Sequence, residues 1–390
     1  MNPILWIIFI IVAEFLLYLI VQGTRSGEGL ERRGISVLPY GVLVDLGKVP
    51  RFSRVERAGE GVVKALAIAG AVLTAILAFF FYYLLLPSAI SLIYSLIIPR
   101  APAAPAFVPV LPGITVSLET FTVIIIVAAV AMAVHELAHA LAARASGVRV
   151  NEWGVGVFLF FPVAYVKVDE ESMSKADLGR KAAVLSAGVM ANVALFLISM
   201  ALMVPAAAAI PYEGTYPVLI STVPNTPADA AGFPTPSVIL SINGTPTPTV
   251  ESVKDYLMPH ADENVTYVFV VEPLISRGFG CRYYELSGEK VEVTVKKPAG
   301  GWKIGIMIGE GPAIAPGTPD YVLMTACFLI WSQIVNGSLA IINAAPIFIT
   351  DGGQLLREAL KRAGLEKLNV PIQATTAGLL AVTLALSLIA

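Results

Sequence analysis

The chain has 390 residues, of which 56% are hydrophobic and 14% charged, and its mean hydropathy is +0.78. These values lie outside the usual balance of soluble globular domains and predict a membrane protein. The formal net charge of −2 gives no basic surface, which argues against a nucleic-acid partner.

Several apolar stretches are long enough to form helices that cross a hydrocarbon core of about 30 Å. They are residues 3–22, 63–98, 121–143, 182–210, 321–345 and 372–390. The sequence therefore predicts an α-helical polytopic membrane protein with about six transmembrane helices, surrounded by membrane lipid. The first stretch is expected to be a retained anchor, because no Lys or Arg precedes it. Residues 63–98 are long for one span, and Pro87 could divide them into a crossing and a surface or re-entrant piece.

Lys and Arg alternate between the connections that join these stretches. Residues 22–62 hold seven of them, 144–181 six and 346–371 four, whereas 99–120 holds Arg100 alone. By the positive-inside rule the three basic connections are cytoplasmic. The long insert between the fourth and fifth stretches is then extracytoplasmic.

One predicted helix, residues 118–145, carries ionisable groups in its apolar interior: His135, Glu136 and His139. At 3.6 residues per turn the two histidines share a face, so both imidazoles can reach one metal ion. Glu136 can then take a proton from a water molecule at that metal. Interhelical hydrogen bonding is the simpler interpretation, but an unpaired Glu in a membrane helix is costly and a metal offsets that cost.

A catalytic zinc site usually has three protein ligands, and Asp351 is the best candidate for the third. It follows a predicted span, and Pro346 and Gly352 let the backbone break and restart so that the carboxylate can point inward. The alternative is that Asp351 caps the following helix. His260, the remaining histidine, lies in the insert and is a poor candidate.

Three segments resemble motifs of the site-2 protease family of intramembrane metalloproteases. HELAHA begins at His135, NAAPIFITDGG spans residues 343–353, and SAGVMANVALF spans residues 186–196 with Gly188 and Asn192 at matching positions. The likeness covers about 118–196 and 321–363. Val189 and Thr350 depart from the family pattern without removing a metal-binding or proton-transferring group.

The resemblance implies a single zinc ion held by His135, His139 and Asp351, with Glu136 as the general base. It also implies that Asn343 and Asn192 position the substrate or polarise its carbonyl group. For Asn192, an ordinary interhelical hydrogen bond remains an equal alternative.

Two segments outside these motifs are predicted to form β structure. Residues 153–168 are rich in β-branched and aromatic side chains, which favours a short strand pair beside the HExxH helix. The resemblance to the site-2 protease family also implies such a β element. Its edge could pair with an unwound substrate. The insert, residues 213–312, contains alternating runs and is predicted to be β-rich. Its residues 222–257 resemble a PDZ domain, which implies a peptide or substrate tail as a partner.

The two cysteines, Cys281 in the insert and Cys327 in a predicted span, are too few and too far apart in environment for a disulfide framework or a thiolate zinc site. Both are expected to be structural.

The chain therefore divides into an N-terminal transmembrane region (1–117, with cytoplasmic loop 22–62), two parts of a catalytic membrane core (118–212 and 313–390), and an extracytoplasmic PDZ-like domain (213–312). We predict an intramembrane zinc metalloprotease of a multi-pass cell-membrane type. Its active site faces the cytoplasmic side, and its substrates are single-span membrane proteins. The alternatives are a membrane metalloprotease with a cytosolic site and a Glu ligand, and a non-proteolytic PDZ-bearing scaffold or metal-dependent regulator.

Overall fold

The computed structural model describes residues 3–23, 26–48, 59–98, 105–159, 161–260, 263–299 and 304–389. Five arginines that entered the charge argument lie outside the described residues: Arg25, Arg51, Arg54, Arg57 and Arg100. The chain forms two compact units. Unit 1 comprises Met1–Leu202 and Phe328–Ala390, and unit 2 comprises Met203–Cys327.

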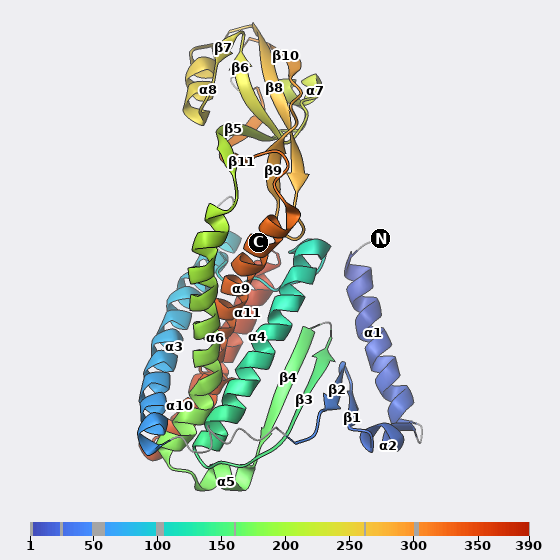
Figure 1. Ribbon diagram of the computed structural model, residues 1–390. Coiled ribbons are helices and arrows are strands. Elements are labelled where there is room, and N and C mark those ends of the chain that lie inside the picture. Colours follow the sequence, from blue (N-terminus) through green and yellow to red (C-terminus); the bar gives the residue numbers. More distant parts are fainter. Residues whose placement is uncertain are drawn as a thin grey trace. The chain divides into compact units, whose positions relative to one another are not determined.

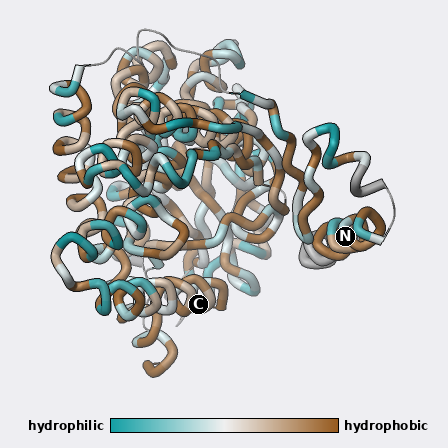
Figure 2. Tube along the Cα trace, turned by 90° about the horizontal axis from the view of Figure 1, so that it is seen from below, coloured by the Kyte–Doolittle hydropathy of each residue, from teal (hydrophilic) through white to brown (hydrophobic). Residues whose placement is uncertain are grey.

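Unit 1 is mainly a bundle of helices that run side by side (Figure 1). Five helical segments in the described part of the chain are long and apolar enough to cross a membrane. They contain α3 (Glu60–Ile97), α4 (Leu118–Ala145), α6 (Leu178–Ala208), α9 (Asp320–Ala344) and α11 (Asn369–Ser387), the last preceded by the turn η2 (Glu366–Leu368). Their turns are mainly hydrophobic (Figure 2). This agrees with a polytopic membrane protein.

The first two predicted spans correspond to α1 and α3. The first falls on α1 (Pro3–Gln22), whose described apolar part, Phe9–Gln22, is shorter than the other spans. Residues 63–98, for which the sequence left division at Pro87 open, form one continuous helix, α3, of 38 residues with Pro87 inside it. Helix-breaking residues are tolerated in membrane helices because neighbouring groups satisfy the freed backbone.

The predicted strand pair at 153–168 forms as β3 (Val150–Phe158) and β4 (Phe161–Val168), which pair antiparallel. The sheet also contains β1 (Ile35–Leu38) and β2 (Gly41–Asp45) from the N-terminal loop, which were not predicted. The strand order is β1-β2-β3-β4, so β4 is an edge strand, and it lies beside α4 (Figure 1).

Short helices complete unit 1 at the ends of the bundle. They are α2 (Ser26–Glu31), α5 (Glu170–Lys175) and α10 (Asp351–Arg362).

Unit 2 is β-rich, as the insert was predicted to be. Its seven-stranded sheet has the order β10-β8-β9-β11-β5-β6-β7, with a further pairing of β8 and β6. The strands are β5 (Tyr212–Thr222), β6 (Ser237–Ile242), β7 (Thr245–Pro246), β8 (Val265–Arg277), β9 (Tyr283–Leu286), β10 (Val291–Lys297) and β11 (Ile306–Ile314). Short helices α7 (Pro227–Ala231) and α8 (Val250–Leu257), and the turn η1 (Met258–His260), complete it.

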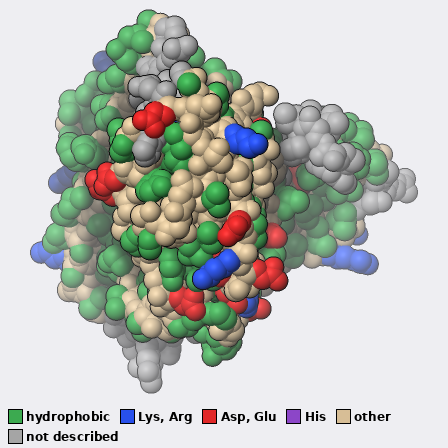
Figure 3. Space-filling model, turned by 90° about the horizontal axis from the view of Figure 1, so that it is seen from above, with side chains coloured by type: hydrophobic (Ala, Val, Ile, Leu, Met, Phe, Trp, Pro, Cys, Tyr) green, Lys and Arg blue, Asp and Glu red, His purple; other side chains and the backbone are tan. Residues whose placement is uncertain are grey.

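The core of unit 2 is a cluster of buried apolar side chains that includes Leu219, Ile239, Tyr267 and Phe269. On the face shown in Figure 3, acidic and basic side chains are scattered rather than gathered in one patch of either sign. The identification of this unit as a PDZ domain stays a prediction.

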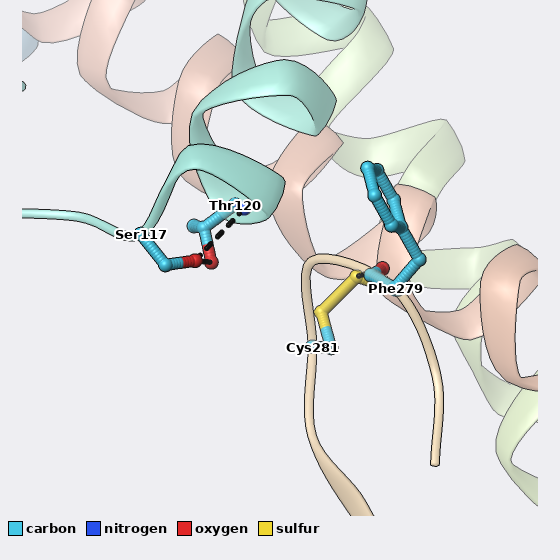
Figure 4. The surroundings of a disulfide bond; sticks show 5 residues. Ser117, Thr120, Phe279 and Cys281 are labelled. Atoms are coloured by element: carbon cyan, nitrogen blue, oxygen red, sulfur yellow. Dashed lines mark hydrogen bonds between the residues drawn. A yellow bond between two sulfur atoms is a disulfide. The ribbon is translucent and has the colours of Figure 1, made fainter. Parts of the chain in front are cut away.

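The expectation that the two cysteines are too far apart in environment for a disulfide is wrong. Cys281 and Cys327 form a disulfide, the surroundings of which are shown in Figure 4. The pattern of hydropathy places Cys327 in a span, but unit 2 extends to Cys327 and includes the first turns of α9. Arg277 also joins the sheet to the start of α9. Its guanidinium pairs with Glu285 at 2.6 Å and with Asp320 at 2.9 Å.

In the bundle, α3 and α6 approach closely at Gly70. A Cβ at this position would lie 1.9 Å from Ser186 Oγ, 2.7 Å from Ser186 Cβ and 2.9 Å from Met190 Sδ. Glycine therefore allows a contact that any side chain would push apart.

We predict that Gly70→Ala lowers the thermal unfolding temperature of the detergent-solubilised protein, because overpacking costs about 1–3 kcal/mol. Gly378→Ala in α11 is the matched control, since a Cβ there meets nothing within 4 Å. Its unfolding temperature should stay the same or rise, because alanine favours a helix over glycine. Equal behaviour of the two variants would contradict the close approach of α3 and α6.

Candidate metal and active site

Two histidines of α4 and the first residue of α10 meet inside unit 1. His135 Nε2 and His139 Nε2 lie 3.1 Å apart, and each lies 3.3 Å from Asp351 Oδ2. His135 is 4% exposed and Asp351 9%. The structure therefore brings together the three residues that the sequence predicted as metal ligands, although 211 residues of chain separate His139 from Asp351.

The far side of each imidazole ring is held by a group from α6. His139 Nδ1 lies 2.7 Å from the carbonyl oxygen of Val184. A carbonyl only accepts hydrogen bonds, so Nδ1 carries a proton, and Nε2 is the nitrogen that a neutral ring offers to a metal ion. The side-chain amide of Asn192 lies 3.1 Å from His135 Nδ1, and Asn192 is completely buried.

The position of Asp351 is set by a tight turn before α10. Thr350, not Asp351, is the N-cap, since its Oγ1 accepts a hydrogen bond from the backbone N–H of Gly353. The same hydroxyl donates to the carbonyl oxygen of Ala345. The carboxylate of Asp351 can therefore face the histidines. The capping role that the sequence offered for Asp351 belongs to Thr350.

The two glycines after Asp351 are required by the closeness of the preceding turn. A Cβ at Gly352 would lie 2.0 Å from the carbonyl oxygen of Ala344, and one at Gly353 would lie 1.8 Å from that of Ile347. Both contacts are with backbone atoms, which cannot move aside as a flexible side chain would. The Asp-Gly-Gly run thus folds against its own approach segment and holds the carboxylate in place.

The three donor atoms fit a small tetrahedral cation. Ligands about 2.0–2.1 Å from a tetrahedral zinc ion are about 3.3 Å from one another, which matches the distances found here. Asp351 Oδ2 is buried and has no hydrogen-bond partner in the described part of the chain, which is the pattern expected of an oxygen that binds a metal ion.

Gly188 of α6 leaves the space that such an ion needs. A Cβ at Gly188 would lie 2.4 Å from His135 Nε2 and 2.5 Å from His139 Nε2. This position therefore lies next to the nitrogen atoms that would bind the metal, and only a residue without a side chain keeps it open.

Glu136 lies beside this centre on a cavity of about 700 Å³. A ligand oxygen of Glu136 and the ligand nitrogens of the two histidines lie within 4.8 Å of one another. A backbone hydrogen bond from Val166 of β4 holds the Glu136 carboxylate. Asn343 also lines the cavity, whereas Asn192 does not line it and contacts His135 from outside.

Charged side chains of α6 and α10 border the same cavity. Lys181 Nζ and Glu358 Oε2 form an ion pair of 2.8 Å, in which both side chains are mostly buried. This pair joins the start of α6 to the helix that carries Asp351.

Sequence reasoning missed several groups that complete the centre. The carbonyl of Val184 and the amide of Val166 are backbone groups, which leave no trace in the residue pattern. Gly188 was noted as part of a motif, but its role depends on α6 crossing α4, which no local pattern reports.

We predict that Gly188→Ala lowers the affinity of the purified protein for zinc at least tenfold, because the methyl group occupies space next to both Nε2 atoms. Zinc affinity is measured by competition with a chromogenic chelator. Gly337→Ala in α9 is the control, since its Cβ meets Phe196 at an ordinary 3.4 Å. Wild-type zinc affinity in Gly188→Ala would contradict this geometry.

Comparisons with known proteins agree with the geometry. An uncharacterized protein of Methanocaldococcus jannaschii is 29% identical over 133 residues, and the match spans 34% of each chain. The chain thus covers about a third of the length of this curated relative. The sequence profile of Peptidase family M50 matches residues 121–388, which include all three motif segments. Because this match covers more than half of the chain, the protein belongs to Peptidase family M50, the site-2 protease family that its motifs resemble.

Proposed function

We propose that this protein is an intramembrane zinc metalloprotease that hydrolyses peptide bonds in the transmembrane segments of single-span membrane proteins. Membership of family M50 indicates a metallopeptidase. The finer proposal rests on one observation: the two imidazoles, the carboxylate of Asp351 and Glu136 line the same cavity. The two histidines and Glu136 belong to α4, an apolar helix that is long enough to span a membrane.

His135, His139 and Asp351 would hold the zinc ion. When bound, zinc supplies Lewis-acid chemistry, polarising a peptide carbonyl and lowering the pKa of a water molecule. Two nitrogens and one carboxylate are a usual ligand set for catalytic zinc and leave a fourth position open. Other divalent ions also accept these ligands, and the tight 3.1–3.3 Å spacing favours a small tetrahedral one.

Glu136 is the proposed proton carrier. Its carboxylate accepts a proton from the attacking water and then donates that proton to the amine that leaves as the peptide bond breaks. The backbone amide of Val166 orients the carboxylate for both transfers. Asn343 lines the cavity, and its side-chain amide would donate to the oxygen of the scissile carbonyl as negative charge develops there.

Asn192 is proposed to position His135 rather than to contact the substrate. An imidazole that ligates through Nε2 carries its proton on Nδ1. The Oδ1 atom of Asn192 is buried without a hydrogen-bond partner among the described residues, and a rotation of the amide by 180° brings it to Nδ1, where it would accept a hydrogen bond from that N–H. Asn192 would then do for His135 what the carbonyl of Val184 does for His139.

A substrate must be held extended, since the peptide bonds of a helix are shielded by its own hydrogen bonds. Strand β4 is the edge of its sheet, and its residues Val166 and Val168 line the cavity that contains Glu136. We propose that an unwound substrate segment pairs with this edge. The PDZ-like insert would dock a substrate tail outside the cytoplasm, with the active site on the cytoplasmic side.

Two other functions predict different properties of the protein. A metalloprotease with a Glu in place of Asp351 as third ligand would have Asp351 remote from the histidines, whereas the distance is 3.3 Å. A non-proteolytic PDZ-bearing scaffold would bind a membrane reporter without generating new termini. The proximity of Glu136 to the histidines favours the enzyme.

We predict that Glu136→Gln lowers cleavage of a single-span reporter at least a hundredfold, because the amide cannot accept the proton of the attacking water. New termini within the transmembrane segment are measured by mass spectrometry of the reconstituted protein, and zinc content is measured in parallel.

Glu170→Gln is the matched control, since Glu170 is exposed and lines the same cavity. It should cleave normally, and both variants should keep their zinc. Undiminished cleavage by Glu136→Gln would refute the proposed mechanism, and bound but uncut reporter with the wild-type protein would favour the scaffold.

A further inference from the structure

A second cavity in unit 1, of about 600 Å³, lies where three candidate spans end. Its lining includes the first turns of α3 and α6 and the last turn of α4. The ends of helices that cross a membrane lie near the boundary between hydrocarbon and headgroups. The cavity shares no lining residue with the catalytic cavity.

Basic side chains outnumber acidic ones around this cavity. Lys64, Arg144 and Arg180 line it, together with Glu60 and Asp177. Both acids pair with Arg180, at 3.6 Å and 3.4 Å. Lys64 makes no ion pair with any residue that the structure describes, so its charge is available to a ligand.

A buried hydroxyl in the lining points independently to a missing partner. Ser146 lines the cavity and is 4% exposed, and its Oγ has no hydrogen-bond partner among the residues that the structure describes. Leaving a buried hydroxyl unpaired is costly, so such groups are normally satisfied. The adjacent start of α3 adds to this site, because its N-cap Gly59 provides no side-chain hydrogen bond to the first turn.

An apolar surface leads away from the cavity along α3. Ile68, Val72 and Ile76 follow Lys64 at intervals of four residues, so each side chain neighbours the next along a ridge that winds gradually around α3. They are 58%, 54% and 59% exposed, and Ile68 also lines the cavity. In a span-length helix such a face is in contact with acyl chains.

We propose that this cavity binds the phosphate headgroup of an anionic phospholipid. The headgroup accepts hydrogen bonds from Lys64 Nζ and Ser146 Oγ beside the guanidinium groups of Arg144 and Arg180, and an acyl chain lies along Ile68, Val72 and Ile76. Basic pockets between membrane helices bind lipid headgroups in this way. The acyl-chain face is what favours a lipid over a free phosphate ion.

The test uses the full chain in nanodiscs of phosphatidylcholine with increasing fractions of phosphatidylglycerol. Bound phosphatidylglycerol is counted by native mass spectrometry, and the unfolding temperature is recorded. Wild-type protein should retain phosphatidylglycerol and unfold at a higher temperature in its presence. Lys64→Gln should weaken phosphatidylglycerol binding about fivefold. Lys367→Gln, an exposed lysine that lines neither cavity, should leave it unchanged.

Ser146→Ala separates a ligand contact from a structural role. In phosphatidylcholine alone this variant should unfold at the wild-type temperature or higher, because its hydroxyl has no protein partner to lose. With phosphatidylglycerol it should lose part of the lipid-induced stabilisation. Full stabilisation in Ser146→Ala, or equal losses in Lys64→Gln and Lys367→Gln, would overturn the proposal. So would displacement of phosphatidylglycerol by millimolar inorganic phosphate, which would indicate a free-anion site.

Discussion

The arrangement of the catalytic region depends on two imidazole nitrogens and one carboxylate oxygen that converge within 3.3 Å of one another. The carbonyl of Val184 accepts a hydrogen bond from Nδ1 of His139, which turns Nε2 of the same ring toward Asp351. Neutral imidazole nitrogens and a carboxylate oxygen at this distance repel one another in a buried site. In the proposed function, a metal ion among these three atoms would remove that repulsion.

Close backbone contacts build the room for this ion. Gly188 keeps α6 near α4 without filling the space beside the histidines, and Gly352 and Gly353 let α10 start directly against its own approach segment. Each glycine replaces a side chain that would push a ligand away. The ligands are therefore positioned by helices and a tight turn, which hold a site more firmly than long loops do.

Much of this organisation could be predicted from the sequence because its signals are local. Hydropathy over some twenty residues marks a span, and the four-residue spacing of His135 and His139 places them on one helical face. Asp351 was found because glycines follow it directly after a span. By contrast, Gly188, Val184 and Val166 act through contacts between elements distant in sequence, which no local pattern records.

The N-terminal loop and the cysteines show a different limit. The runs ISVL and GVLV, separated by Pro39 and Tyr40, are a hairpin signal, but they lie in a basic loop that was analysed for charge alone. They extend the sheet whose opposite edge is β4. The disulfide was missed because Cys327 was assigned to the membrane, whereas the first turns of α9 belong to unit 2. In both cases every residue of a segment was assigned the environment of the segment as a whole.

The most direct test of the His-His-Asp centre is the zinc content of the purified full chain after dialysis, compared between wild type and Asp351→Asn. The account predicts one zinc ion per wild-type chain and substantial loss from the variant, because a neutral amide binds zinc more weakly than a carboxylate does. Full zinc occupancy in Asp351→Asn would contradict Asp351 as a ligand. A zinc-free wild-type chain that still cleaves its substrate would contradict the centre as a whole.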